Sequence, residues 1–351
     1  MAVSVLREHA VAGSTLRQRR VGMNKWFAFC GERGINPILQ GGATPYNLDL
    51  AEAFLADAVI TQGLQGDTAR GYLLTVAAAH KALRLPNPVD ISRGTGDWTL
   101  KQAVQAGTNI HPAGGHKRAP FAVDHICAIL ASKQFCAGVM GPTYSALSAA
   151  SYLGMARAQA FTSTTADLFD MFTQITRGDV AVLTLPDGKV RVSLFLPAGK
   201  ANPCGRELVF ESTGHIICAA TSIVRMLEVT PEAAMSGPLF VGANGGPITY
   251  RQWYNVTRKA LKEIGLPTDM YGLHSYRRGG ATALYNQTRD IELVESVGGW
   301  SHLSGTAWSY VEEDQQRLAA QSALITTAGP VQVPTRIRLL QREKRLREEE
   351  Q

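Results

Sequence analysis

The sequence predicts a mainly α-helical protein with one small antiparallel β-sheet, divided between two domains. Apolar residues recur at helical spacing through most of the 351-residue chain, whereas strand-like patterns are confined to residues 179–210. A stretch rich in Pro and Gly, residues 108–118, separates an all-helical first part from the remainder. This length is sufficient for two domains with separate hydrophobic cores.

The composition is that of a globular protein, with 45% hydrophobic and 18% charged residues. We expect neither a membrane span nor a secretion signal, because charges interrupt the apolar runs and the first 20 residues lack an apolar segment. The net charge of +6 favours polyanionic partners, although many basic proteins never bind nucleic acid.

The cysteines predict no zinc site and no disulfide framework. They are odd in number and contain no Cys-x-x-Cys pair, which fits a reducing compartment and small core residues: Cys30, Cys127, Cys136, Cys204 and Cys218. We therefore expect no metal or other cofactor.

Residues 1–107 are predicted to form a helical domain. Helices are expected at residues 14–33, 48–61, 67–85 and 98–105. Ser14 is the candidate N-cap of the first helix, and Pro86 and Pro88 should end the third.

Residues 108–118 are the predicted linker, residues 119–328 the second domain, and residues 329–351 a charged tail. Helices are expected at residues 123–132 and 142–162, and again from residue 213 onwards. Strands are expected at residues 179–185 and 190–196, joined by the turn at Pro186–Gly188, with a third at residues 206–210. The tail carries a run of Arg, Lys and Glu, for which a solvated helix is the default interpretation.

The chemically informative segment is residues 272–314. It contains His274 and Arg277 three residues apart, then Gly298-Gly299-Trp300, then Tyr310. Each piece alone is ordinary, because a lone tyrosine in an amphipathic segment usually packs in a core. The combination and its order are informative.

This order resembles the C-terminal signature of tyrosine recombinases. It is similar to that of phage-type integrases and most similar to that of recombinases from eukaryotic mobile elements (DIRS-like retrotransposons and Cryptons). The resemblance implies a helical core-binding (SAM-like) domain, a basic linker and an α+β catalytic domain. It also implies double-stranded DNA as partner, cleaved and rejoined through a 3′-phosphotyrosine without metal or ATP.

The family needs two further residues upstream. Arg157 fits the first, an arginine on a helix, although Ala160 stands where an acidic partner is common. The second is a lysine in a β-hairpin turn. Lys200 is favoured because it follows the second strand, and Lys189 is the competitor.

The chemistry explains why these residue types are needed. Arg157 and Arg277 would clamp the phosphoryl oxygens, and Tyr310 would attack the phosphorus. His274 would accept the phenol proton or orient the phosphate, and Lys200 would protonate the leaving 5′-hydroxyl.

Trp300 would donate its indole N–H to the same oxygens. The ten residues from Trp300 to Tyr310 are one more than is common in the family, and the turn at Leu303–Thr306 is where we expect this to be absorbed. His302 is the alternative donor. Tyr276 and Tyr285 fit helix packing better than catalysis.

Candidate DNA contacts are less specific. Arg70, Lys81 and Arg84 share one face of the third predicted helix, Lys117 and Arg118 close the linker, and a solvated face explains them equally well. The resemblance further implies a homo-tetramer on paired sites, with residues 311–323 packing on a neighbouring protomer. No membrane or small-molecule partner is expected.

Two other hypotheses remain at this point. Ala160 and the altered spacing favour a DNA-binding relic without activity, and a type IB topoisomerase would use the same chemistry. In each case we expect the protein where DNA is, in the nucleus for a eukaryotic element and otherwise in the cytoplasm or nucleoid.

Overall fold

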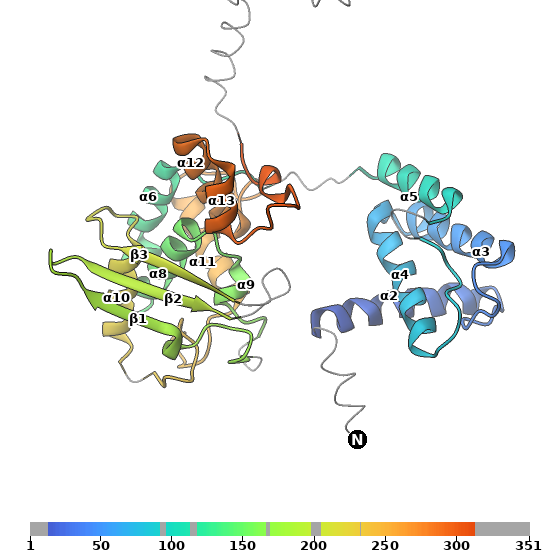
Figure 1. Cartoon of the computed structure of the whole chain (residues 1–351), viewed down its shortest axis with the longest axis horizontal. Helices are drawn as coiled ribbons and strands as arrows, with labels where there is room; N and C mark the ends of the chain where they lie inside the picture. Colours follow the sequence, from blue (N-terminus) through green and yellow to red (C-terminus); the bar gives the residue numbers. More distant parts are fainter. Residues whose placement is uncertain are drawn as a thin grey trace, which may run out of the picture. The chain divides into compact units, whose positions relative to one another are not determined.

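The computed structural model describes residues 13–91, 96–112, 118–165, 169–197, 205–231 and 233–312. The chain divides into two compact units, Met1–His116 and Lys117–Gln351. The first runs from blue to cyan-green and the second from green to orange-red (Figure 1). The described residues are mostly helical with one three-stranded antiparallel sheet, so the predicted fold class is confirmed.

The first unit is entirely helical in its described part. Its elements are α2 (Gly13–Glu32), α3 (Pro45–Ala56), the π-helical turn η1 (Asp57–Thr61), α4 (Gly66–Ala82) and α5 (Trp98–Ile110). An aromatic cluster of Trp26, Phe29 and Phe54 fills the centre, with ring centroids 5.3–5.8 Å apart. Buried His80 accepts a hydrogen bond from the Leu39 amide at 2.9 Å, which ties the loop before α3 to α4.

Two helix ends in this unit differ from the sequence expectation. The third predicted helix ends at Ala82 rather than Leu85, and Arg84 has a left-handed backbone with φ +61°. The fourth extends to Ile110, so it enters the predicted linker at residues 108–118. Asp97 caps its start by accepting a hydrogen bond from the Leu100 amide at 3.0 Å.

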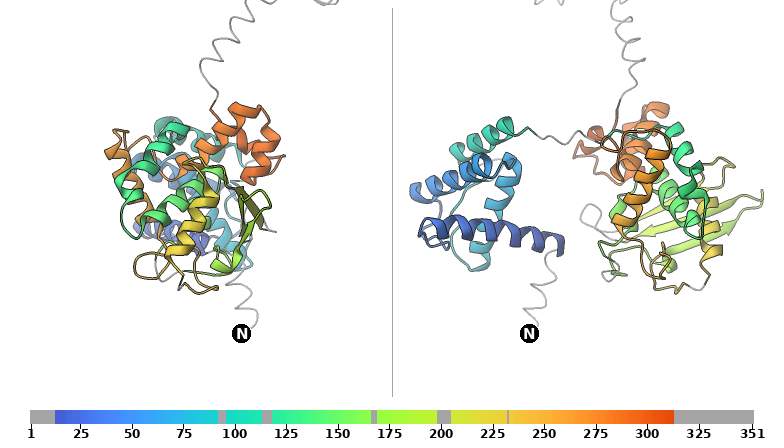
Figure 2. Two further views of the ribbon diagram at one scale, coloured as in Figure 1. Left: turned by 90° about the vertical axis from the view of Figure 1, so that its left-hand side faces the viewer. Right: turned by 180° about the vertical axis from the view of Figure 1, so that it is seen from behind.

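The second unit packs helices against one face of the sheet (Figures 1 and 2). Its elements before the last strand are α6 (Val123–Ala131), α7 (Lys133–Cys136), α8 (Gly141–Leu153), α9 (Ala158–Phe161), η2 (Arg177–Asp179), β1 (Val180–Thr184) and β2 (Val190–Leu196). They continue with β3 (Arg206–Glu211), α10 (Ala219–Val229), α11 (Tyr250–Glu263), α12 (His274–Thr288), α13 (Ile291–Gly298) and η3 (Thr306–Ser309).

The sheet has the order β1-β2-β3, with Val182 opposite Val192 and Val192 opposite Phe210. Alternate residues of β2 and β3 are buried, because strand side chains point to opposite faces. The buried face packs on α10, which in turn packs on α8. A separate small core joins α12, α13 and the segment around Trp300, and it holds the candidate site.

The predicted helix at residues 142–162 is wrong as one continuous element. α8 ends at Leu153, Met155 adopts a left-handed φ of +45°, and α9 begins only at Ala158. Gly154 lies so close to β3 that an added Cβ would come within 2.7 Å of Leu208. Packing against the sheet therefore stops the helix, and Arg157 lies at the start of α9 rather than within a long helix.

The helix predicted from residue 213 also begins later, at Ala219. The Thr213 hydroxyl accepts a hydrogen bond from the His215 amide at 3.3 Å, which favours a turn over a helix. The helix predicted at residues 123–132 is interrupted at Ser132, whose backbone is extended, and α7 follows.

Candidate active site

Helix α12 brings two predicted site residues to Tyr310. His274 is its first residue and Arg277 lies one turn later, so both share a face. The His274 and Tyr310 ring centroids are 5.0 Å apart. The guanidinium carbon of Arg277 lies 5.2 Å from the centroid of the Tyr310 ring.

A glycine pair in the same motif lets α12 lie close to its neighbours. An added Cβ on Gly279 would come within 2.3 Å of the Phe121 carbonyl oxygen, and one on Gly280 within 2.0 Å of the Tyr152 carbonyl oxygen. Any larger residue would push α12 away from the end of α8. The glycines thus fix the helix that carries His274 and Arg277.

Arg277 is buried, with 1% of its surface exposed. Its Nη1 donates to the carbonyl oxygens of Met155 and Gly298, the latter at 3.1 Å. Its Nε and Nη2 are buried and make no hydrogen bond of good geometry with a described residue, although the nearby Tyr310 side chain also acts on the guanidinium. Because an unpaired buried donor is costly, these two N–H groups are suited to an anion entering the site.

The Gly298-Gly299-Trp300 motif places the indole beside the nucleophile candidate. Gly299 ends α13 with a left-handed φ of +66°, and an added Cβ on Gly298 would come within 1.7 Å of the Trp300 ring. The Trp300 amide donates to the Glu295 carbonyl oxygen at 2.9 Å, which sets the direction of the chain. Only glycines fit both positions.

Trp300 contacts both Arg277 and Tyr310. Its ring lies 3.8 Å below the Arg277 guanidinium carbon and 4.9 Å from the Tyr310 ring. Its indole N–H is buried and has no partner among the described residues. The turn before Tyr310, where the extra residue is expected, has Leu303 fully exposed and Gly305 at φ +58°.

Arg157 is exposed and lies at the N-terminus of α9. Its charge acts on His274, Arg206 and Arg277, so it lies near all three. The described part of the chain provides no hydrogen bond or ion pair to the Arg157 side chain. Ala160 supplies only its backbone amide, which donates to the Arg157 carbonyl oxygen at 2.9 Å.

Burial and positive charge shift the pKa values of this cluster. Burial, reinforced by Arg157, lowers the pKa of Arg277 to about 9, which still leaves it charged at neutral pH. Burial also lowers the pKa of His274, and Arg277, Arg278 and Arg157 lower it further. His274 is therefore a neutral imidazole at neutral pH, able to accept a proton.

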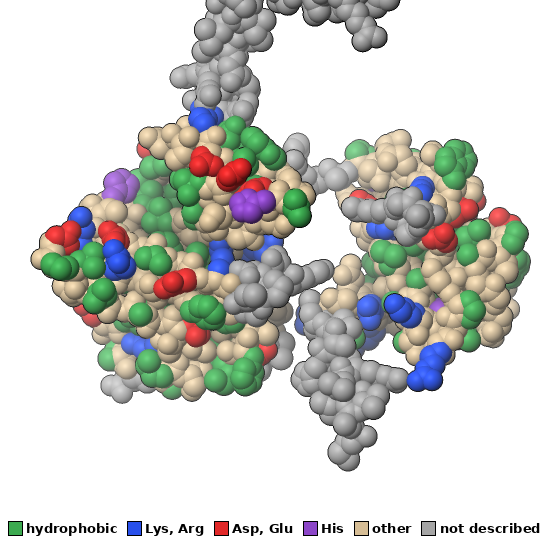
Figure 3. Space-filling view, in the orientation of Figure 1, with side chains coloured by type: hydrophobic (Ala, Val, Ile, Leu, Met, Phe, Trp, Pro, Cys, Tyr) green, Lys and Arg blue, Asp and Glu red, His purple; other side chains and the backbone are tan. Residues whose placement is uncertain are grey.

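Arg206 also belongs to this basic cluster, although no sequence pattern predicted it. It is the first residue of β3, and it donates to the carbonyl oxygens of Val297 and Gly154, the latter at 3.1 Å. Burial and then Arg157 lower its pKa to about 10. Its partners are backbone carbonyls, which leave no side-chain signal in the sequence. Lys and Arg side chains gather below α13 in Figure 3.

Lys200 lies outside the described residues. In the sequence it stands between the end of β2 at Leu196 and the start of β3 at Arg206. Lys189 directly precedes β2, so it is roughly 20 Å along the strand from Leu196 at the opposite end. There it forms an ion pair with Asp187 at 3.0 Å.

The other tyrosines of this region pack in the core. Tyr276 is fully buried, which raises its pKa to about 12, and its hydroxyl lies 3.3 Å from that of Thr257. The Tyr285 ring packs against Trp308 with centroids 5.3 Å apart. Neither is accessible enough to act as a nucleophile in this arrangement.

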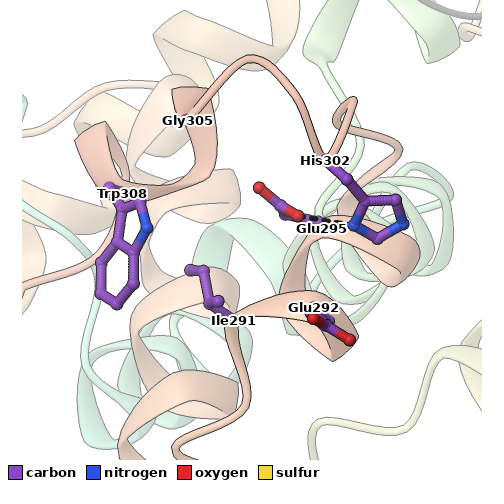
Figure 4. Close-up of a pocket in the computed structure, with 6 residues that line it drawn as sticks. All are labelled: Ile291, Glu292, Glu295, His302, Gly305 and Trp308. Atoms are coloured by element: carbon purple, nitrogen blue, oxygen red, sulfur yellow. Dashed lines mark hydrogen bonds and ion pairs between the residues drawn. The ribbon is translucent and has the colours of Figure 1, made fainter.

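His302, the alternative to Trp300, faces a different part of the surface. Its Nδ1 lies 2.7 Å from the Glu295 carboxylate, at the edge of a pocket of about 420 Å³ (Figure 4). Ile291, Glu292, Gly305 and Trp308 line the rest of this pocket. Trp300, not His302, packs against Tyr310, with the two ring planes tilted by 56°.

The candidate DNA contacts have varied surroundings within their own units. Arg70 donates to the Ile91 carbonyl oxygen at 3.1 Å, and Lys81 is exposed near the end of α4. Arg84 lies beyond that helix, so the predicted shared face with Arg70 and Lys81 is wrong. Arg118 donates to the Asp269 carbonyl oxygen, and Lys117 lies outside the described residues.

The described residues contain neither a candidate metal centre nor a candidate membrane span. No group of three or more His, Cys, Asp and Glu side chains there is arranged to hold a metal ion. Within the same ranges, no helix combines the length and apolar character needed to cross a membrane.

The segment that carries this geometry also matches a known family. Residues 212–317 match the model of the phage integrase family. The chain is 31% identical over 94 residues to tyrosine recombinase XerC of Halalkalibacterium halodurans, and 30% identical over 86 residues to XerH of Campylobacter jejuni. These alignments cover 26% and 24% of this chain, and only 31% and 24% of the two relatives.

Solved structures resemble a much larger part of the chain. A structure of the Tn1549 transposon integrase in complex with circular intermediate DNA has a TM-score of 0.53 at 14% identity. It covers 93% of this chain and 98% of that one. XerH bound to a palindromic difH substrate has a TM-score of 0.51 at 16% identity, covering 78% and 72%.

At these identities the solved structures show the fold alone, which is that of tyrosine recombinases and integrases. The match to the family model covers the segment that contains His274, Arg277 and Tyr310. Together the comparisons show that residues 212–317 are similar to the phage integrase family and that the fold is similar to that of tyrosine recombinases and integrases.

Proposed function

We propose that this protein is a site-specific DNA recombinase that cleaves and rejoins DNA through a 3′-phosphotyrosine at Tyr310. One observation carries the proposal: three buried N–H groups without partners lie next to Tyr310. They are Nε and Nη2 of Arg277 and Nε1 of Trp300. A phosphodiester entering there would satisfy all three, so the same contacts that bind it would stabilise the charge that develops during attack.

The reaction would begin with the Tyr310 phenol attacking the scissile phosphorus. Neutral His274, whose ring lies 5.0 Å from that of Tyr310, would accept the phenol proton directly or through one water. The new bond joins the phenolic oxygen to phosphorus, and the bond to the 5′-oxygen breaks. Arg157 and Arg277 would bear the negative charge on the phosphoryl oxygens.

The departing 5′-oxygen needs a proton, which we assign to Lys200. In rejoining, the 5′-hydroxyl of another strand attacks the phosphotyrosine and Tyr310 leaves with its proton restored. Each step exchanges one phosphate ester for another, so rejoining would need no ATP, and Arg157 and Arg277 would supply the positive charge that a metal ion could otherwise provide.

The substrate we propose is the double-stranded DNA at the ends of a mobile element, which the enzyme would integrate or rearrange. The motif's similarity to mobile-element recombinases supports this, as does the fold shared with the Tn1549 transposon integrase. Such an enzyme would act wherever its target DNA lies, in the nucleus or nucleoid. The first unit would serve as the core-binding domain, and Arg118 with Lys117 would follow the DNA backbone between the units.

Covalent capture tests the proposal. A nicked suicide substrate made from the DNA that flanks the coding gene prevents rejoining, so cleaved DNA stays attached to protein. We expect wild-type protein to form this adduct and Tyr310→Phe to form none while binding the same DNA within about twofold. DNA binding without any adduct in wild-type protein would favour the inactive relic instead.

We further propose that the enzyme works as a tetramer on paired sites. The segment at residues 311–323 would pack on a neighbouring protomer, although most of it lies outside the described residues. A chain truncated at Glu313 should bind single sites normally and lose cooperative pairing of two sites in a gel-shift assay. Unchanged pairing by the truncated chain would refute this assembly.

A further inference from the structure

Arg277 and Arg278 are neighbours in sequence with opposite surroundings. Arg277 faces Trp300 and Tyr310 with two free N–H groups, whereas most of the Arg278 guanidinium is already bonded. Arg278 is 5% exposed; its Nη1 donates to the Ser309 carbonyl oxygen at 2.7 Å and its Nη2 to the Glu312 carboxylate at 2.6 Å. Those two acceptors lie on either side of Tyr310 in the chain.

Two further residues of α12, spaced by four from Arg278, also contact the chain around Tyr310. Thr282, one turn after Arg278, donates to the Tyr310 carbonyl oxygen at 3.3 Å and accepts from the Glu312 amide at 3.2 Å. Asn286, a further turn along, donates to the Glu312 carbonyl oxygen at 3.2 Å. Residues spaced by four lie above one another on a helix, so these side chains form one row facing residues 309–312.

The chain around Tyr310 has little regular structure of its own. It follows the single 3₁₀ turn η3, and the Tyr310 amide bonds back only to the Ala307 carbonyl oxygen, at 2.9 Å. The loop before η3 protrudes, with Leu303 fully exposed. The direction of the Tyr310 side chain therefore depends on the row of α12 that holds its backbone.

The ion pair is the strongest link in this row. Arg278 is buried, while Glu312 is 51% exposed on its side chain. Removing the carboxylate would leave a buried guanidinium with one of its charge-assisted bonds unmade. Glu312 thereby also occupies the Arg278 charge, whereas Arg277, on the neighbouring face of α12, keeps Nε and Nη2 for a phosphate.

We propose that Arg278 is a positioning residue for Tyr310. The ion pair between Arg278 and Glu312, called the latch below, holds the backbone on both sides of Tyr310 against α12. This inference rests on the proposed function, because it assigns a role in the step that Tyr310 performs. Loss of the latch should slow attack on the phosphorus by roughly 10- to 100-fold, since small misplacement of a reacting group has effects of that size. DNA affinity should stay unchanged, because neither residue contacts the bound phosphate.

The test measures affinity and chemistry separately in the full-length protein. Dissociation constants come from fluorescence anisotropy on intact DNA, and single-turnover adduct formation comes from the nicked suicide substrate. We expect Glu312→Ala to lower the adduct rate most and Glu312→Gln less, because the amide oxygen still accepts a hydrogen bond. Glu292→Gln, an exposed carboxylate on α13, is the matched control for loss of one negative charge.

Arg278→Lys provides a second test, since lysine keeps the charge but cannot bond Ser309 and Glu312 in the same fork. We expect a slowed adduct rate at wild-type affinity here too. Wild-type adduct rates in both Glu312→Ala and Arg278→Lys would overturn the latch. A loss of DNA affinity as large as the loss of adduct rate would overturn it too. In either case adduct formation by wild-type protein would leave the proposed function standing, and only its absence would refute that function.

Discussion

At the residue scale, the site concentrates positive charge around one neutral imidazole. Arg277, Arg278 and Arg157 each lower the pKa of His274 after burial has done so. A protonated His274 would place a further positive charge beside these three guanidinium groups, and their repulsion disfavours protonation. His274 is thus kept in the form that can take a proton from Tyr310.

The pKa of His274 should accordingly lie below its ordinary value of about 6.5 in DNA-free protein. At a pH between the lowered pKa of the folded chain and 6.5, His274 binds a proton in the unfolded chain but not in the folded one. The free energy of unfolding should therefore decrease as pH falls below 6.5. NMR titration of the imidazole signal measures the pKa, and Arg157→Gln should raise it. A wild-type pKa at or above 6.5 would contradict the proposed electrostatics.

Sequence patterns predicted some of these residues and not others, for a physical reason. His274, Arg277, Trp300 and Tyr310 stand in a recognisable order, and the structure brings their side chains together. Arg206 and Arg278 were not predicted. Arg206 bonds only backbone carbonyl oxygens, to which every residue type contributes alike, so no paired side chain marks it in the sequence. Arg278 pairs with the Glu312 carboxylate, but 34 residues separate the two, a spacing that no local pattern links.

At the scale of elements, α12 carries the site and its placement depends on Gly279 and Gly280. One face of this helix presents His274 and Arg277 to the Tyr310 side chain. The neighbouring row, which includes Thr282, contacts the backbone around Tyr310. A shift of α12 away from α8 would therefore move the charge-binding groups and the nucleophile together.

Gly280→Ala should destabilise the fold, because its Cβ would lie within 2.0 Å of the Tyr152 carbonyl oxygen. Forced repacking of this kind typically costs about 1–3 kcal/mol of unfolding free energy. Urea unfolding followed by circular dichroism measures it. Gly246→Ala is the control, since its nearest contact would be an ordinary 3.6 Å. A Gly280→Ala variant as stable as the control would show that α12 tolerates a wider spacing.

The helix boundaries show where local patterns fail. Residues 142–162 have continuous helical periodicity, yet the approach of Gly154 to β3 ends α8 at Leu153. Arg157 is displaced from the predicted helix as a result, and it lies close to Arg206 and Arg277. Contacts between segments distant in sequence determine this turn, so periodicity alone could not predict it.

At the scale of the whole molecule, the sequence predicted the fold class, a mostly helical chain with one small antiparallel sheet. The boundary between the two compact units lies between His116 and Lys117. Residues that would contact DNA are harder to predict, because the sequence does not distinguish an exposed Lys or Arg that binds phosphate from one that is only solvated. Arg70 illustrates this: its guanidinium bonds the Ile91 carbonyl oxygen within its own unit.

The decisive experiment identifies the residue that becomes joined to DNA. Full-length protein is incubated with the nicked suicide substrate, the adduct is digested with protease and nuclease, and the modified peptide is sequenced by mass spectrometry. We predict a nucleotide 3′-phosphate on Tyr310 and on no other residue. An adduct on Tyr276, Tyr285 or any other side chain, or no adduct on DNA that the protein binds, would contradict the role assigned to Tyr310.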